Sequence, residues 1–292
     1  MKVLIPVDGS RSSENAVRVV CEHWQDWGEG EPILLINVTR ALATEVTEEL
    51  SNDGLPFSDL SQEMLKRYYQ HACDSAFVNA EKLLNEAGIP YRKLYEAGPI
   101  AAKIQAHAER ENVNLIVMGT RGQTQFESLL FGSVMTDLIA NTTIPTLVVA
   151  NVYEPHRHEI PKIVVAMDTM QSLTKPLEYV LGQQNAFGAR ARYELIHVEG
   201  VNEQTLLTKT AVQHVSIPNA QWRDRFDALG LDIDCVKLAG ETGMAIVEYC
   251  QQSQADMLVM GSHGYDRLRS AMMGSIVRRV ASLTKIPLLI VR

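Results

Sequence analysis

The sequence repeats itself, and this feature limits the possible folds more than any other. Residues 114–149 and 256–291 align without a gap at a shift of 142 and are identical at 12 of 36 positions, including every glycine. Nearer the start of each half, residues 2–10 resemble residues 162–170 at a shift of 160. Self-similarity of this kind indicates a duplicated unit. We therefore expect one domain at 1–150, a polar linker with two prolines at 151–161, and a second domain at 162–292.

Short apolar runs alternate with longer amphipathic stretches in both halves, a pattern typical of βαβ units and a parallel sheet. The prediction is an α/β protein made of two tandem Rossmann-like domains, each an open five-stranded parallel sheet with helices on both faces. Strands are expected at 2–7, 32–38, 90–95, 114–118 and 145–149, then at 162–167, 191–198, 232–238, 256–260 and 287–291. Helices are expected at 12–26, 61–87, 99–111 and 133–141, then at 173–186, 203–229, 242–253 and 275–283.

Composition and charge exclude several classes of function. The apolar runs are shorter than the ~20 residues that span a bilayer, and no basic stretch precedes an apolar segment at the start. The formal charge is −8, and nucleic-acid binding usually needs a basic face. The four cysteines lie far apart without a CxxC pair, so neither a zinc site nor a disulfide framework is indicated. We expect a soluble, cytoplasmic protein without nucleic-acid or membrane partners.

A constellation of glycines follows the fourth expected strand of each half. Its spacing is G-x2-G-x9-G-S, at Gly119, Gly122, Gly132 and Ser133 and again at Gly261, Gly264, Gly274 and Ser275. Glycine allows close backbone approach, and the helix that starts at the serine offers unpaired N–H groups to an anion. Asp8 and Asp168 end the first strand of each half, at the sheet edge where open α/β folds bind ligands. Together these elements predict a nucleotide or phosphate cleft in each half.

The duplicated glycine spacing, the early aspartate and the final strands PTLVV and PLLIV resemble those of tandem universal stress protein domains, over nearly the whole chain. The resemblance implies an ATP-binding, cytoplasmic stress-response protein, with Mg²⁺ accompanying the phosphates. It also implies pairing through the last strands, Thr146–Val149 and Leu288–Val291. In a tandem chain these two strands can pair with each other as an internal pseudo-dimer, and whole chains can form a homodimer.

The resemblance carries the nucleotide contacts onto matching positions. In the first half they are Pro6, Val7, Asp8, Val38, Met118, Gly119, Gly122, Gly132, Ser133 and Val134. In the second half they are Ala166, Met167, Asp168, Val198, Met260, Gly261, Gly264, Gly274, Ser275 and Ile276. Arg121 and His263 occupy the same place in the glycine turn, where either can reach a phosphate or stay solvated. The second half departs at Ala166-Met167-Asp168-Thr169, which replaces Pro6-Val7-Asp8-Gly9.

Simpler interpretations remain open for several of these residues. The glycines can be turn residues, the two aspartates can be helix caps, and the methionines can serve packing. His156 and His158, with Glu154 or Glu159, can be weighed as a metal site, but no further His or Cys lies nearby in sequence.

No motif of a catalytic class accompanies the glycines. There is no G-x4-G-K-(S/T), no G-x-S-x-G and no H-E-x-x-H, which favours binding over turnover. The alternatives are an interaction scaffold that needs no nucleotide, and a slow nucleotide hydrolase. Arginines near the second glycine loop predict that the second cleft attracts a triphosphate more strongly than the first.

Overall fold

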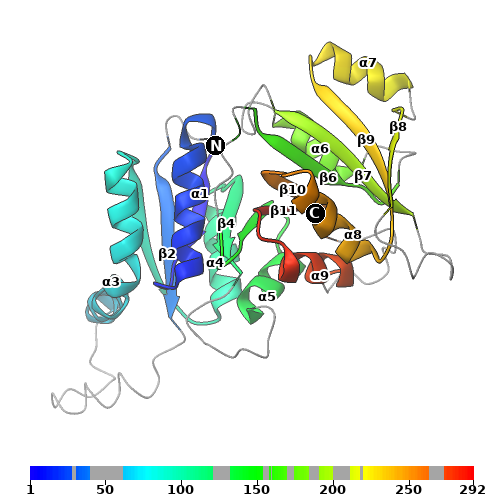
Figure 1. The fold of residues 1–292 in the computed structure, drawn as a ribbon. Helices are drawn as coiled ribbons and strands as arrows, with labels where there is room; N and C mark the ends of the chain where they lie inside the picture. Colours follow the sequence, from blue (N-terminus) through cyan, green and yellow to red (C-terminus); the bar gives the residue numbers. More distant parts are fainter. Residues whose placement is uncertain are drawn as a thin grey trace.

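The computed structural model describes residues 1–27, 31–39, 62–120, 132–153, 158, 160–169, 174–183, 191–199, 211–217, 220–262 and 273–292; for 26, 62–72, 211, 220 and 221 it describes the backbone alone. Within these ranges eleven strands form one sheet, in the order β3-β2-β1-β4-β5-β11-β10-β6-β7-β9-β8. Figure 1 shows the two halves side by side along this sheet. None of the helices that the structure describes is long and apolar enough to cross a membrane.

The first half follows the predicted βαβ pattern. Its elements are β1 (Val3–Pro6), α1 (Arg11–Trp27), β2 (Ile33–Thr39), α3 (Gln62–Glu86), β3 (Tyr91–Ala97), α4 (Ile100–Arg110), β4 (Leu115–Gly119), α5 (Ser133–Asn141) and β5 (Thr146–Val149). All neighbouring strands among β3, β2, β1, β4 and β5 are parallel. The carboxyl ends of β1 and β4 therefore lie together at one edge, as a ligand site of this fold class requires.

The second half repeats this arrangement with one addition. Its elements are β6 (Lys162–Ala166), α6 (Lys175–Gly182), β7 (Arg192–Glu199), β8 (Ala211–Val215), α7 (Ala220–Ala228), β9 (Asp232–Ala239), α8 (Thr242–Gln252), β10 (Met257–Gly261), α9 (Ser275–Leu283) and β11 (Leu288–Val291). Strands β11, β10, β6, β7 and β9 are parallel. β8 is antiparallel to β9 and ends the sheet.

The predicted helix over 203–229 is wrong at residues 211–215, which form β8, and is confirmed at residues 220–228, which form α7. The sequence AVQHV includes two β-branched valines, which favour a strand. It pairs with β9 along its whole length, from Ala211 opposite Ala239 to Val215 opposite Cys235. The second half therefore has a sixth, antiparallel strand in addition to the five expected.

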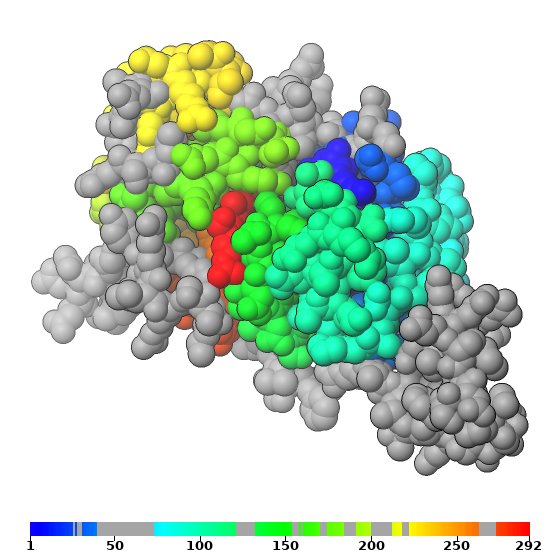
Figure 2. Space-filling model, turned by 180° about the vertical axis from the view of Figure 1, so that it is seen from behind, coloured from blue at the N-terminus to red at the C-terminus, as the bar shows by residue number. Residues whose placement is uncertain are grey.

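The two halves join through their last strands. β5 and β11 pair antiparallel, with Leu147 opposite Leu289. The Arg292 guanidinium donates to the carbonyl oxygens of Ala140 and Thr142, at the carboxyl end of α5 in the other half. Figure 2 shows the red segment that ends in Arg292 lying against the green segment of β5 and α5. Backbone pairing and a side-chain clamp thus hold the halves together.

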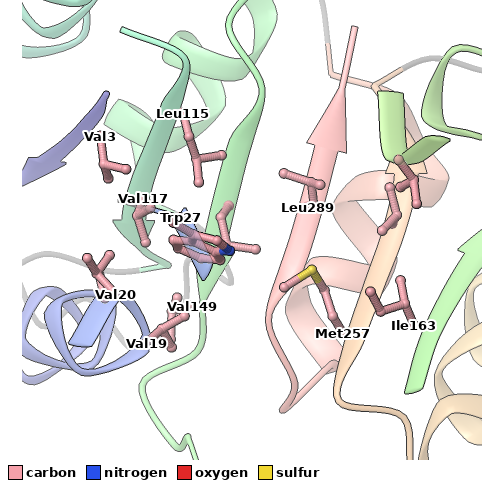
Figure 3. Packing of buried hydrophobic residues seen from close by; sticks show 14 of the residues in the cluster. Val3, Val19, Val20, Trp27, Leu115, Val117, Val149, Ile163, Met257 and Leu289 are labelled. Atoms are coloured by element: carbon pink, nitrogen blue, oxygen red, sulfur yellow. The ribbon is translucent and has the colours of Figure 1, made fainter. Parts of the chain in front are cut away.

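The core forms a layer on each face of the sheet. One layer contains Val3 and Ile5 with side chains from α1, α3, α6 and α7, and the other contains Leu4 with side chains from α4, α5, α8 and α9. Successive strand residues point to opposite faces, so a sheet buried on both sides needs continuous apolar strands. Figure 3 shows the first layer running from Val117 and Val149 across to Leu289, Met257 and Ile163. The seam between the halves is therefore part of the core.

Candidate functional site

The segment after β1 forms a tight turn into α1. Gly9 has φ +74°, which glycine adopts without strain. The Asp8 carboxylate accepts a hydrogen bond from the Ser10 N–H at 3.0 Å, and Ser10 Oγ accepts from the Ser13 N–H at 3.3 Å. The residue that caps α1 is therefore Ser10, and Asp8 orders the turn ahead of it, at the carboxyl edge of the sheet.

The residue before each aspartate makes two hydrogen bonds to the neighbouring strand, one through its N–H and one through its carbonyl oxygen. Val7 N–H donates to Ile36 O at 2.8 Å, and Val7 O accepts from Asn37 Nδ2 at 2.6 Å. In the second half, Met167 N–H donates to Ile196 O at 2.9 Å, and Met167 O accepts from His197 Nδ1 at 3.0 Å.

Sequence reasoning missed Asn37 and His197. They are related by the same shift of 160 that relates Asp8 to Asp168, which is the signal that could have found them. Because an amide and an imidazole look unrelated in sequence, their shared role as donors to the preceding strand becomes visible only in the structure.

The residues that flank each glycine loop are hydrogen-bonded to each other. Thr120 N–H donates to Val149 O, and Thr120 O in turn accepts from Gly132 N–H at 3.2 Å. In the second half, Ser262 N–H donates to Val291 O, and Ser262 O accepts from Gly274 N–H at 3.1 Å. Each loop is therefore closed directly in front of a helix. Arg121, Gly122, His263 and Gly264 belong to the loops themselves, at 121–131 and 263–272, and lie outside the described residues.

The helices behind the loops start without a side-chain cap. Gly132 is the N-cap of α5 and Gly274 is the N-cap of α9, and among the described residues no side chain caps the first N–H groups of either helix. The first N–H groups of an α-helix have no partner within the helix. Ser133, Ser275 and Ile276 in these first turns are exposed, Ile276 to 40%. Within the described part of the chain, each half thus presents helix N–H groups without a side-chain cap, and an exposed serine beside them, at the carboxyl edge.

Gly119 and Gly132 differ in whether the structure requires a glycine at that position. A Cβ on Gly119 would lie 2.5 Å from Ser12 Oγ and 2.6 Å from the Ser12 carbonyl carbon, so glycine there lets α1 pack closely against β4. Gly132 has an ordinary φ of −67°, and a Cβ there would meet Thr120 O at 3.5 Å, a normal contact. Neither its backbone conformation nor its packing against the described residues therefore demands glycine at 132.

A groove of about 650 Å³ adjoins the start of α5 in the first half and falls in the size range of small-molecule sites. Among the predicted site residues, Ser133 and Val134 line it. The remaining lining comes from the start of α4 and from the exposed side of α5, at Gly98, Pro99, Ile100, Ala101, Ala102, Gln105, Asp137 and Asn141.

Other predicted site residues are largely buried. Val7, Met118, Met167 and Met260 are at most 5% exposed and belong to the core layers. Val38 is buried, while Ala166 and Val198 pack against the core from partly buried positions, and Pro6 ends β1. These side chains pack the wall of the carboxyl edge, so a ligand would meet mainly their backbone and the edges of their side chains.

The electrostatics of the second half centre on Asp168. Burial raises the pKa of the Asp168 carboxyl, and the nearby His197 charge acts in the opposite direction.

In the linker, His158 Nδ1 lies 2.9 Å from the Asp256 carboxylate, which gives this histidine a structural partner. The residues weighed with it as metal ligands, His156, Glu154 and Glu159, lie outside the described part of the chain.

Comparisons with known proteins agree with this architecture. Residues 1–150 and 159–292 each match the model of the universal stress protein family. Universal stress protein Slr1230 of Synechocystis is 24% identical over 301 residues, which cover 99% of each chain. Universal stress protein MJ0531 of Methanocaldococcus jannaschii is 30% identical over 152 residues, or 51% of this chain and 81% of that protein.

A solved structure extends the agreement to three dimensions. The crystal structure of a universal stress protein from Archaeoglobus fulgidus has a TM-score of 0.65 and 18% identity, and the match covers 100% of this chain and 96% of that one. The likeness shows the fold across both halves. On the family match to each half, the chain belongs to the universal stress protein family, as a member with two tandem Rossmann-like domains.

Proposed function

We propose that each half binds an adenine nucleotide, ATP with its Mg²⁺, and that occupancy biases the conformation of the chain or its choice of partner in a cytoplasmic stress response. One observation carries the proposal: in both halves a closed glycine loop ends at a helix whose first N–H groups have no side-chain cap. Such helix starts favour phosphate groups through unpaired donors and the helix dipole.

The first half supports the proposal through Gly132 and the groove beside it. Neither the backbone conformation of Gly132 nor its contacts with the described residues require glycine, and the absence of a side chain is what close approach of a phosphate requires. Ser133 and Val134, the next two residues, line the groove of about 650 Å³. A nucleotide that places its phosphates at the start of α5 would therefore have space beside it.

The two sites differ in charge. Arg278 and Arg279 are exposed on the first turns of α9, and the Arg278 guanidinium reaches Met273 O beside Gly274. The matching positions on α5 hold Thr136 and the exposed Asp137. Attraction between opposite charges fades over a Debye length of about 8 Å at physiological salt. The second site should therefore bind a triphosphate more tightly than the first, with a steeper salt dependence.

Calorimetric titration of Mg·ATP into the full chain, stripped of copurified nucleotide, tests the proposal. Gly132→Asp and Gly274→Asp each place a carboxylate at one helix start, where it repels phosphate. The matched control is Gly182→Asp, at an exposed position where a Cβ meets nothing within 4 Å. We expect two sites per chain, loss of one site in each variant, and an unchanged control.

Other results would contradict the proposal in distinct ways. No saturable heat at two temperatures would favour the nucleotide-independent scaffold. Phosphate release within the usual enzyme range of ~1–10³ s⁻¹ would favour a hydrolase. Equal affinities for the two single-site variants would contradict the charge difference between the sites.

A further inference from the structure

Asn37 and His197 occupy equivalent positions in the two halves, and they make the two sites chemically different. Both side chains donate to the carbonyl oxygen just before the site aspartate, at 2.6 Å in the first half and 3.0 Å in the second. This bond fixes the end of the first strand of each half, from which Asp8 or Asp168 follows. The two residues thus share a positioning role, but only one of them can change its charge.

The hydrogen bond defines which ring nitrogen of His197 holds a proton. A carbonyl oxygen only accepts, so Nδ1 carries a proton in either charge state, and the second proton is taken up at Nε2. His197 can therefore become cationic while its bond to Met167 O persists. Histidine is the side chain that ordinarily changes charge between pH 5 and 8, whereas the Asn37 amide stays neutral.

The charges around His197 form a small cluster at the carboxyl edge. Asp168 follows β6, and Glu199 lies two residues along β7 on the same face. Lys237 of β9 lies opposite His197 in the strand register and pairs with Glu199 at 2.6 Å. The next residue across, Gln213 of β8, is uncharged.

The helices on this face bring apolar side chains to it. Leu177, Val180 and Leu181 of α6 and Trp222 and Phe226 of α7 are buried there. The charged residues of these helices are exposed, namely Lys175, Glu178, Arg223, Asp224, Arg225 and Asp227. Asp168, Glu199 and Lys237 together carry one net negative charge, which a protonated His197 cancels.

From this placement we propose that His197 is a positioning residue, and that the second-half site binds an anionic nucleotide more tightly when the His197 imidazole is protonated. The first half lacks this property because the Asn37 amide stays neutral. The inference rests on the proposed nucleotide site. The His197 charge acts on both carboxyls: it opposes the larger effect of burial, which raises the pKa of Asp168, and it adds to the effect of Lys237, which lowers the pKa of Glu199.

The expected effect is about fivefold in affinity, which corresponds to ~1 kcal/mol of attraction between a cationic imidazole and the nucleotide. Low salt keeps the effect measurable, because dissolved ions screen this attraction.

The test measures Mg·ATP affinity by calorimetry at pH 6 and pH 8 in the full chain carrying Gly132→Asp, so that only the second site binds. Lowering the pH should tighten binding about fivefold more with His197 than with His197→Asn, which installs the amide of the first half and keeps a donor for Met167 O. The reciprocal change Asn37→His, in a Gly274→Asp chain, should add the pH dependence to the first site. Protonation of ATP itself is the same in every comparison and cancels.

The outcomes separate this inference from the function on which it rests. Nucleotide binding with the same pH dependence in the His197 and His197→Asn chains overturns the role of His197 and leaves nucleotide binding standing. Binding confined to the first half also overturns the role of His197. No binding in any chain at either pH overturns the proposed function itself. Circular dichroism at both pH values confirms that each variant is folded.

Discussion

Replacing Arg292 with alanine should weaken the seam between the halves at a definite place. The guanidinium donates to the carbonyl oxygens of Ala140 and Thr142. Ala140 lies in the last turn of α5, where backbone carbonyl groups have no partner within the helix. The Arg292→Ala change removes both hydrogen bonds and the positive charge that faces the negative end of the helix dipole.

The magnitude follows from the kind of bond that is lost. A hydrogen bond from a charged donor contributes about 1.5–3 kcal/mol, and water can replace part of it because Arg292 is only partly buried. We expect a loss of about 1–2 kcal/mol, which is about a 5–30-fold change in an opening equilibrium.

Hydrogen exchange locates the effect better than global unfolding, because a chain with two domains need not unfold in one step. The amides of the last turn of α5, from Leu138 to Thr142, should exchange about 5–30-fold faster in Arg292→Ala. Arg292→Lys should lie between, since it keeps the charge and loses the fork of donors. The control is Arg192→Ala, which breaks an exposed pair with Asp232 and should cost less than about 1 kcal/mol. Unchanged exchange in α5 would refute the claim that the Arg292 hydrogen bonds stabilise the last turn of this helix.

Two further predictions concern the first half. Gly119→Ala should lower stability by about 1–3 kcal/mol, because its Cβ would lie 2.5 Å from Ser12 Oγ, whereas Gly132→Ala should change it little; equal melting temperatures for the two variants would contradict this reasoning. For Glu96, burial acts to raise the pKa, but hydrogen bonds from His107 and Lys103 hold it below its usual value. A lowered folded-state pKa stabilises the fold above the unfolded value of ~4.3 and loses that contribution as the pH falls through the folded value. Glu96→Gln should therefore cost more stability at pH 7 than at pH 3, and urea titrations with an equal cost at both pH values would contradict the ion pair.

Much of this fold was predictable because both faces of the sheet are buried. The strands around Leu4, Leu115 and Leu288 are continuous apolar runs bounded by turns, and their positions in the two halves support each other. The starts of α5 and α9 were predictable for a similar reason, since Ser133 and Ser275 stand at the same place in the two copies of one spacing.

The features that the sequence did not predict depend on contacts between residues that are distant in sequence. The stretch that holds β8 reads as part of a long amphipathic segment until β9 supplies the partner for its backbone. The close approach of Ser12 to Gly119 is likewise invisible in a linear pattern. The hydrogen bonds from Asn37 and His197 depend on strand register, and the two side chains share chemistry only as donors.

The seam between β5 and β11 has a consequence for how the two halves can diverge. Two identical chains that pair across a two-fold axis must carry the same residue on both sides, and their pairing weakens on dilution. Here a covalent link makes the pairing intramolecular, so its strength does not depend on protein concentration. Each half is then free to change alone: Arg292 has Ala150 as its counterpart, and His197 has Asn37. Duplication within one chain converts an enforced symmetry into two separately adjustable sites.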